Sequence, residues 1–147
     1  TLTAVLYGVL VSSLAYINHV RSLPPDIAVF ESMTWIKEHS LGVKNVLSHP
    51  QKGFWIAYGS DATPFITYDD PDYELKMDLT NRVFSSRDLK NTTLFLQNNN
   101  ISLIWIDPSM KNGQVWHNND EGLLFLLRNE RFKRVYSRDG IEIWRFR

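Results

Sequence analysis

The stretch ISLIWID, residues 101–107, decides the fold class because it carries the strongest strand signal in the chain. It is rich in β-branched and aromatic residues, and neither of its two faces is polar. The turn-forming asparagines at 98–100 precede it directly. A strand that is apolar on both faces belongs in a sheet covered on both sides, as in parallel α/β proteins. The stretch therefore favours an α/β domain over an all-β sandwich.

Downstream of this stretch, the sequence predicts a loop at 108–117 and then a helix that begins at one of residues 118–120 and ends at Leu127. Two alternating segments follow, at 132–137 (FKRVYS) and 141–145 (IEIWR). They are separated by Arg-Asp-Gly, and Asp-Gly between alternating strands is the strongest short-range hairpin signal. The chain is therefore expected to end in an antiparallel hairpin.

Upstream of the same stretch, short apolar strands alternate with helices, which predicts a parallel sheet between two helical layers. The strands are expected at 44–48 (KNVLS) and 64–68 (PFITY); the helices at 27–39, 54–58 and from Asn91 or Thr92 to Asn98; and loop with short helices at 73–91. The predicted fold class is thus α/β, three-layer, with a mainly parallel sheet and a C-terminal antiparallel hairpin.

The first 18 residues contain no charged side chain, and Pro24-Pro25 stops any helix that they form. Residues 1–22 are therefore interpreted as a membrane-proximal or transmembrane helix, and residues 23–147 as a soluble α/β domain. A spanning helix needs about 20 apolar residues, and this run is near the short limit. A helix buried in the domain itself stays open as the alternative.

Composition limits the function classes. The 147 residues carry a formal net charge of +0, which gives no electrostatic reason to expect a nucleic-acid partner. The chain has no cysteine, so disulfides, thiolate metal sites and a cysteine nucleophile are excluded. The glycines are scattered rather than gathered in a phosphate-binding loop, and the four histidines lack metal-ligand spacing. No cofactor and no metal site are therefore expected.

The sharpest candidate for ligand binding is an acidic run, Asp69, Asp70 and Asp72, which directly follows the strand at 64–68. Open α/β sheets bind their ligands beyond the carboxyl ends of the strands. Carboxylates in this position suit a divalent cation or the hydroxyl groups of a sugar. A solvated turn is the alternative, because Asp and Pro are common turn residues.

Two further segments follow predicted parallel strands and are expected at the same edge of the sheet. In the first, His49 and Lys52 are candidates for binding an anionic or sugar ligand, with Trp55 stacking on it or packing on the sheet instead. In the second, Trp116 and His117 lie in the loop after residue 107. Trp116 is interpreted either as an exposed ligand or membrane contact or as a lid over the sheet edge.

The order of several segments resembles the C-terminal extracytoplasmic domain of multi-pass membrane glycosyltransferases of the GT-C class. These include lipid-linked-sugar mannosyltransferases and oligosaccharyltransferase-like proteins. The resemblance covers residues 27–147 and rests on TWIKEHS (34–40), VLSHPQKGFWIAY (46–58), PFITYDDP (64–71), NNISLIWID (99–107) and FKRVYSRDGIEIWRF (132–146).

The resemblance implies a membrane protein whose soluble domain lies on the extracytoplasmic side. It implies a lipid-linked sugar donor, a membrane domain of the same polypeptide as partner, and a glycan or acceptor peptide as ligand. Catalytic acidic residues of such enzymes lie in the membrane portion, so no catalytic residue is assigned to this chain. The Trp-Trp-Asp motif of oligosaccharyltransferases is missing, since Ser48-His49-Pro50-Gln51 stands near its place.

The function expected from the sequence is therefore a non-catalytic domain that shapes the acceptor side or braces the membrane domain. Two alternatives stay open: a membrane-anchored carbohydrate- or protein-binding module, and a small metal-dependent enzyme that uses the acidic run. Two N-glycosylation sequons, at Asn91 and Asn100, are compatible with an exported domain.

Overall fold

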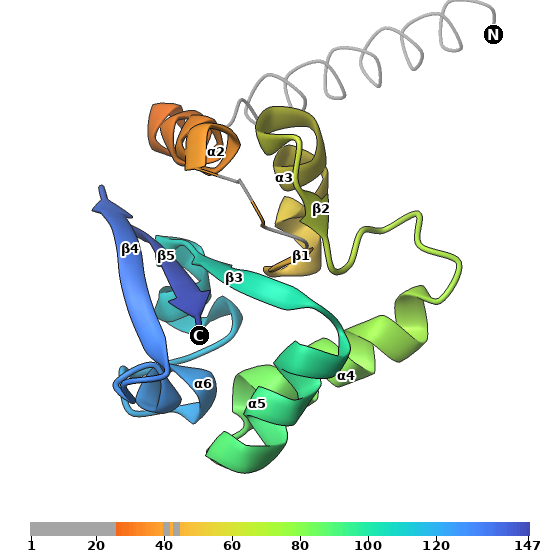
Figure 1. Ribbon diagram of the computed structural model, residues 1–147, viewed down its shortest axis with the longest axis vertical. Coiled ribbons are helices and arrows are strands. Elements are labelled where there is room, and N and C mark those ends of the chain that lie inside the picture. Colours follow the sequence, from red (N-terminus) through yellow and green to blue (C-terminus); the bar gives the residue numbers. More distant parts are fainter. Residues whose placement is uncertain (1–25, 40–41, 43–44) are drawn as a thin grey trace, which may run out of the picture.

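A computed structural model describes residues 26–39, 42 and 45–147 of the chain (Figure 1). The elements follow one another as α2 (Ile27–His39), β1 (Asn45–Leu47), η1 (Pro50–Lys52), α3 (Gly53–Ser60), β2 (Thr63–Pro64), α4 (Tyr73–Ser85), α5 (Leu89–Asn98), β3 (Ile101–Ile106), η2 (Met110–Gln114), α6 (Gly122–Leu126), β4 (Phe132–Arg138) and β5 (Ile141–Phe146). The helix expected at residues 1–22 lies outside the described residues. Among the described residues, no helix has the length and apolar character needed to cross a membrane.

Five strands form one sheet in the order β2-β1-β3-β5-β4 (Figure 1). The strand β1 pairs in parallel with β2 on one side and with β3 on the other. The two C-terminal strands join antiparallel, β5 to β3 and β4 to β5. In the turn between them, Asp139 and Gly140 have φ of 49° and 79°, as a two-residue hairpin turn requires. The predicted parallel core and C-terminal hairpin are confirmed.

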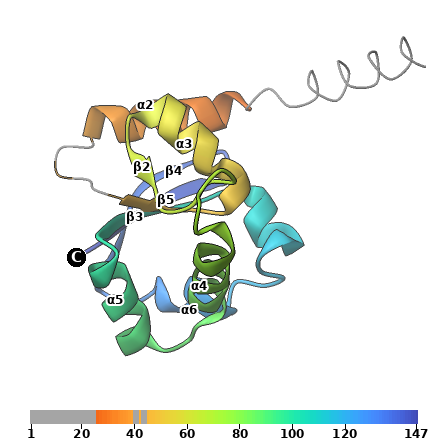
Figure 2. The ribbon, with the colours of Figure 1, turned by 90° about the vertical axis from the view of Figure 1, so that its right-hand side faces the viewer.

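Helices cover both faces of this sheet, as Figure 2 shows: α2 and α3 lie on one face, and α4, α5 and α6 on the other. Successive strand residues alternate between the two layers. Thus Val46, Leu103 and Trp105 pack with α2 and α3, whereas Leu47 and Ile104 pack with the opposite layer. The three-layer α/β class is confirmed, and the strand at residues 101–107 is apolar on both faces for the predicted reason.

The buried Trp105 also carries a polar contact across the sheet-helix interface. Its indole N–H donates to Ser32 Oγ at 3.0 Å, and the Ser32 hydroxyl donates to the Val29 carbonyl at 2.7 Å. Both polar groups are thus satisfied inside the core, which fixes α2 in register on the sheet.

The second parallel strand is shorter than predicted and begins earlier. Only Thr63 and Pro64 pair as strand residues, although the Phe65 N–H still donates to the Val46 carbonyl at 2.8 Å. The chain then turns, because the Thr67 N–H donates to Asp70 Oδ2 at 3.2 Å and the Asp70 N–H to the Thr67 carbonyl at 3.2 Å. The Asp side chain competes with ladder pairing, so the predicted strand over 65–68 is wrong.

The polar segment at 73–91 is wrongly predicted as loop with short helices, because it contains the 13-residue helix α4. Its inward positions are Tyr73, Met77, Thr80 and Phe84, which have helical spacing. The buried Thr80 and the charged residues between these positions conceal the period. The helix α4 is therefore stabilised mainly by tertiary packing, and its sequence pattern indicates a helix only weakly.

The next helix begins at Leu89, two or three residues earlier than predicted. The side chain of Asp88 caps α5 by accepting the Asn91 N–H at 3.1 Å, so Asn91 lies inside the first turn. Conversely α6 begins later than predicted, at Gly122. A Cβ on Gly122 would meet the Phe84 carbonyl oxygen at 1.9 Å, so this close approach needs a glycine and pins α6 to the end of α4.

Candidate functional site

The carboxyl ends of β1 and β3 lie side by side, and the loops that follow them meet there. After β1, Pro50 begins the short helix η1, and His49 caps it by accepting the Gln51 N–H on Nδ1 at 3.3 Å. Gly53 then lies against β2's continuation, since a Cβ there would meet the Ile66 carbonyl oxygen at 2.3 Å. This close packing aims Lys52 towards the loop that follows β3.

Lys52 forms an ion pair with Asp107, with Nζ 3.0 Å from Oδ2. The other oxygen of Asp107 accepts the Ser109 hydroxyl at 2.7 Å and the Met110 N–H at 3.0 Å. Burial alone would raise the pKa of this carboxyl group. The hydrogen bonds from Ser109 and Met110, together with the Lys52 ammonium, outweigh burial and hold the pKa of Asp107 below its ordinary value.

A second contact joins the same two loops through Gln114. Its side-chain amide N–H groups face Gln51 Oε1 at 2.6 Å and His49 Nδ1 at 3.3 Å. Burial lowers the pKa of His49; the Asp107 charge raises it and the Lys52 charge lowers it, with a lowered pKa as the result. A neutral imidazole with its proton on Nε2 fits this arrangement, because Nδ1 faces two donors.

These contacts form what is called here the loop clamp: His49, Gln51, Lys52, Asp107, Ser109 and Gln114. Both oxygens of Asp107 and the ammonium of Lys52 have partners within the clamp. Its chemistry is that of a satisfied hydrogen-bond network, which holds two loops together at one edge of the sheet. The sequence-predicted residues His49 and Lys52 are brought together here.

The acidic run after β2 does not join the loop clamp. Asp69 accepts the Thr67 hydroxyl at 2.5 Å, and Asp70 pairs with Lys76 at 2.7 Å. Asp72 is exposed at the start of α4. Within the described part of the chain, no three His, Asp or Glu side chains are grouped as they would be to hold a metal ion. The run shapes the turn that leads into α4.

Two aromatic rings flank this acidic run. The rings of Tyr68 and Tyr73 lie 5.5 Å apart at an interplanar angle of 31°, and Tyr68 is exposed. The run Asp69–Asp72 lies between them in the sequence. Neither tyrosine is among the site residues predicted from the sequence, although an aromatic residue on each side of an acidic turn is visible there. We refer to residues 68–73 as the acidic loop.

The two tryptophans predicted as ligand contacts lie elsewhere. Trp116 is 2% exposed, its indole N–H donates to the Phe84 carbonyl at 2.8 Å, and its ring packs edge-on against Phe84. Of its two interpretations, packing is the one that the structure supports, because a buried ring cannot meet a ligand. His117 is exposed, with Nδ1 3.8 Å from Glu121. Trp55 is partly exposed on the outer side of α3, where it faces α2.

The clamp residues Asp107, Ser109 and Gln114 were missed by sequence analysis. Asp107 was counted as the end of a strand, although a carboxylate directly after a buried strand and before Pro-Ser is a visible signal for a turn cap. Gln114 gives no comparable signal. It is positioned by the wide turn η2, whose kink at Asn112 and Gly113 no spacing rule predicts.

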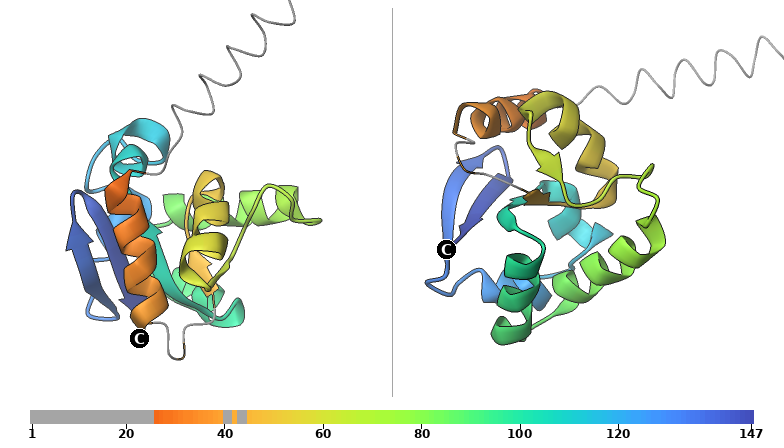
Figure 3. Two further views of the ribbon diagram at one scale, coloured as in Figure 1. Left: turned by 90° about the horizontal axis from the view of Figure 1, so that it is seen from above. Right: turned by 45° about the vertical axis from the view of Figure 1, so that its right-hand side comes forward.

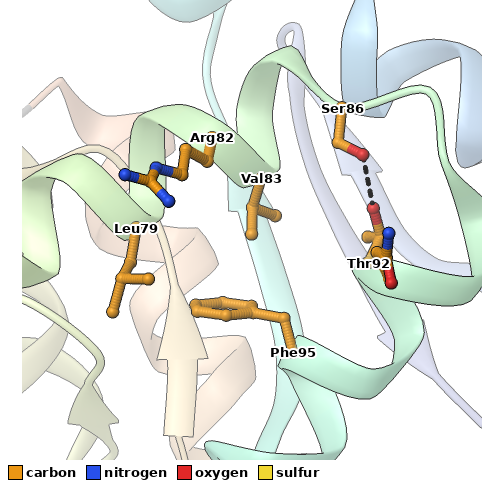
Figure 4. Close-up of a pocket in the computed structure, with 7 residues that line it drawn as sticks. Leu79, Arg82, Val83, Ser86, Thr92 and Phe95 are labelled. Atoms are coloured by element: carbon orange, nitrogen blue, oxygen red, sulfur yellow. Dashed lines mark hydrogen bonds between the residues drawn. The ribbon is translucent and has the colours of Figure 1, made fainter.

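A pocket of about 170 Å³ opens between α4 and α5 (Figure 4). Apolar side chains form its wall, and the Thr92 hydroxyl donates to Ser86 Oγ at 3.1 Å at one end. Its lining comprises Leu79, Arg82, Val83, Ser86, Asn91, Thr92 and Phe95. Asn91, in the first predicted sequon, is exposed and donates to Asp88 Oδ2 at 2.7 Å. None of the predicted ligand-binding residues lines this pocket.

Comparisons with protein-family models and with curated proteins gave no match. Among solved structures, the chain is similar to the C-terminal globular domain of an oligosaccharyltransferase from Archaeoglobus fulgidus, with a TM-score of 0.60 and 13% identity, over 80% of this chain and 95% of that one. It is also similar to an Archaeoglobus fulgidus oligosaccharyltransferase tethered to an acceptor peptide with the NVT sequon, with a TM-score of 0.50 and 11% identity.

The second match covers 59% of this chain and 14% of that larger one. At these identities the likeness concerns the fold. The protein thus has the fold of an oligosaccharyltransferase C-terminal globular domain, and the resemblance found in the sequence is confirmed at that level.

Proposed function

We propose that this chain is the C-terminal, extracytoplasmic domain of a membrane glycosyltransferase that uses a lipid-linked sugar donor. In this proposal the domain is not catalytic itself. It shapes the acceptor side of the enzyme or braces its membrane domain. The observation that carries the proposal is the fold likeness, which spans 95% of an oligosaccharyltransferase C-terminal globular domain.

Two features of the chain support the non-catalytic role. The most buried carboxylate at the sheet edge, Asp107, is neutralised by Lys52 and has both oxygens occupied, so it is not free to act as a general base. The carboxylates of the acidic loop are divided among Thr67, Lys76 and solvent rather than facing one point. Displacement of a lipid-phosphate leaving group requires converging acid-base groups or a metal.

The charge-free run at residues 1–18 supports the membrane attachment. In this proposal the run is a membrane stem, and the domain follows it on the extracytoplasmic side. The membrane domain of the same polypeptide is its partner, and a glycan or an acceptor peptide is its ligand.

The acidic loop supports a second candidate, a carbohydrate-binding role. Tyr68 offers an exposed ring face to the apolar side of a sugar, and Asp69 and Asp72 offer acceptors to its hydroxyl groups. This role is compatible with the first, because a domain that shapes the acceptor side would contact glycan. It is also what a membrane-anchored binding module would use.

The sequence upstream of Thr1 tests the first proposal most directly. A glycosyltransferase of the GT-C class should show many further hydrophobic spans there, whereas a single span near the start codon would support the anchored binding module instead. The purified chain should not transfer sugar from a lipid-linked donor. Turnover by this chain alone, lost in Asp69→Ala or Asp70→Ala, would instead support the metal-dependent enzyme.

A further inference from the structure

An exposed apolar patch covers the outer side of the α2/α3 layer. Ile27 and Phe30, in the first turns of α2, are 76% and 62% exposed, and Tyr58 of α3 is 82% exposed. Trp55 is partly exposed beside them, and a groove of about 110 Å³ runs between the two helices here. These four residues, Ile27, Phe30, Trp55 and Tyr58, are called the aromatic patch.

The aromatic patch is separate from the core that these helices supply. On α2, the inward positions Val29, Met33 and Ile36 pack on the sheet, so Ile27 and Phe30 point to the opposite side. On α3, Ile56 is the apolar side chain that enters the core, and Trp55 and Tyr58 lie on the outer side. Figure 3 shows that the two helices lie next to each other as the outermost layer.

The apolar residues gather at one end of α2. The opposite end of the helix carries Lys37, Glu38 and His39, and Lys37 pairs with Asp61 at 2.9 Å. The outer surface therefore changes along the helix from mainly apolar, with Glu31 paired to Arg138 at 2.8 Å, to charged. Such a gradient fits a surface that enters an interface at one end and leaves it at the other.

The apolar end of α2 is also the end nearest to the charge-free run in the sequence. Only residues 19–25 separate Asn18 from Asp26, and they span at most roughly 28 Å when fully extended. If the charge-free run lies in a bilayer, the first turn of α2 is held within that reach of its surface. Under that condition the first turn of α2, which carries Ile27 and Phe30 of the aromatic patch, would lie near lipid.

We propose that the aromatic patch rests on the lipid bilayer, at the boundary between headgroups and acyl chains. Trp and Tyr are enriched at this boundary because each has an apolar body and a polar tip. The patch itself carries no charged side chain, so its attraction to lipid is apolar rather than electrostatic. This inference rests on the membrane attachment in the proposed function, and it adds which face of the domain meets the membrane.

The absence of cysteine permits a clean test, because a single introduced cysteine can carry an environment-sensitive dye. The full chain is reconstituted in phosphatidylcholine vesicles that contain lipid with a nitroxide near the top of the acyl chain. With Tyr58→Cys as the labelled site, the dye should lose about half of its emission, since an interfacial face is buried about 5–10 Å. The loss should change little with salt.

Two control sites are also exposed but lie elsewhere on the domain. Glu38→Cys lies at the charged end of α2, and Leu94→Cys lies on α5, on the opposite face of the sheet. Dyes at both sites should keep their emission. Replacing Ile27 and Phe30 by serine should reduce the quenching at position 58, because half of the patch is then removed.

A dye at Val11→Cys distinguishes a failure of the proposed membrane stem from a failure of the inference about the aromatic patch. Quenching at position 11 but not at 58 would leave the membrane stem standing and overturn the inference about the patch. Absence of quenching at position 11 would overturn the membrane stem. A blue shift at position 58 that rises with protein concentration without lipid would identify a second copy on the patch, and would overturn lipid as its occupant.

Discussion

Two regions follow parallel strands of the sheet, the loop clamp and the acidic loop, and they differ in how many of their polar groups already have partners within the protein. The loop clamp joins the segments after β1 and β3, and its buried carboxylate has three partners. The acidic loop after β2 keeps Asp69 and Asp72 at the surface. Topology therefore places both loops where α/β proteins bind ligands, but the local hydrogen bonds leave the acidic loop more available.

The largest difference is expected on removing the carboxylate of each loop. Asp107→Ala should lower the free energy of unfolding by about 3 kcal/mol, because it leaves the buried Met110 N–H and the half-buried Lys52 ammonium without their acceptor. Urea unfolding followed by tryptophan fluorescence measures this.

The matched control is Asp69→Ala in the acidic loop. Asp69 is exposed, so its removal should change the free energy of unfolding by no more than about 0.5 kcal/mol. Equal losses of unfolding free energy in the two variants would contradict the conclusion that the carboxylate of the clamp is more fully paired than that of the acidic loop.

An intermediate effect is expected for Asp70, which belongs to the acidic loop but is half-buried. Its carboxylate accepts Lys76 and the Thr67 N–H. Asp70→Ala should lower the free energy of unfolding by about 1 kcal/mol, since the ammonium can regain water while the backbone group loses its partner. Lys76→Met, which removes the ion pair but keeps the turn, should cost less. The reverse order would assign the effect to the ion pair.

The pH dependence of stability offers a smaller and more specific test of the clamp. Burial holds the pKa of His49 below its ordinary value of 6.5, so the unfolded chain takes up this proton first as the pH falls. The contribution of His49 is therefore fully present above that value and is lost as the pH falls through the lower, folded-state pKa.

Between pH about 7 and about 5, the free energy of unfolding should thus decline more steeply for the wild type than for His49→Asn. Parallel profiles for the two proteins, or a wild type that gains stability as the pH falls, would contradict a partly buried, neutral imidazole in the clamp.

The sequence predicted the fold where one segment carried its own signal. The stretch ISLIWID is apolar on both faces, and Asp139-Gly140 marks the hairpin turn, so the parallel core and the closing strands followed from local rules. The helix α4 did not, because its inward face includes Thr80 and depends on packing against α6 and the sheet. Spacing rules detect apolar side chains and not burial itself.

The sequence predicted the edge of the sheet at which the candidate site lies, but not which side chains pair with one another there. Rules for parallel sheets placed His49, Lys52 and the acidic run at strand ends. They did not show that Asp107 neutralises Lys52, since that contact spans more than 50 residues of sequence. Nor did they show that Trp116 is buried, because a tryptophan in a loop gives the same signal whether it covers a helix end or faces solvent.

The smallest expected effect is a difference in ligand binding between the acidic loop and the loop clamp. Titration of the chain with a short glycan, followed by amide chemical shifts, should perturb residues of the acidic loop, where Tyr68 and Asp69 are exposed. The amides of Gln51 and Met110 should move little, because they already donate to clamp residues, to His49 Nδ1 and Asp107 Oδ1 respectively. Tyr68→Ala should abolish the shifts without loss of stability, since its ring is at the surface.

Shifts confined to the clamp would instead place the ligand on the loops that follow β1 and β3. No shifts at all would leave both loops to dock on a protein surface, because an edge that binds no glycan still presents hydrogen-bonding groups to a partner.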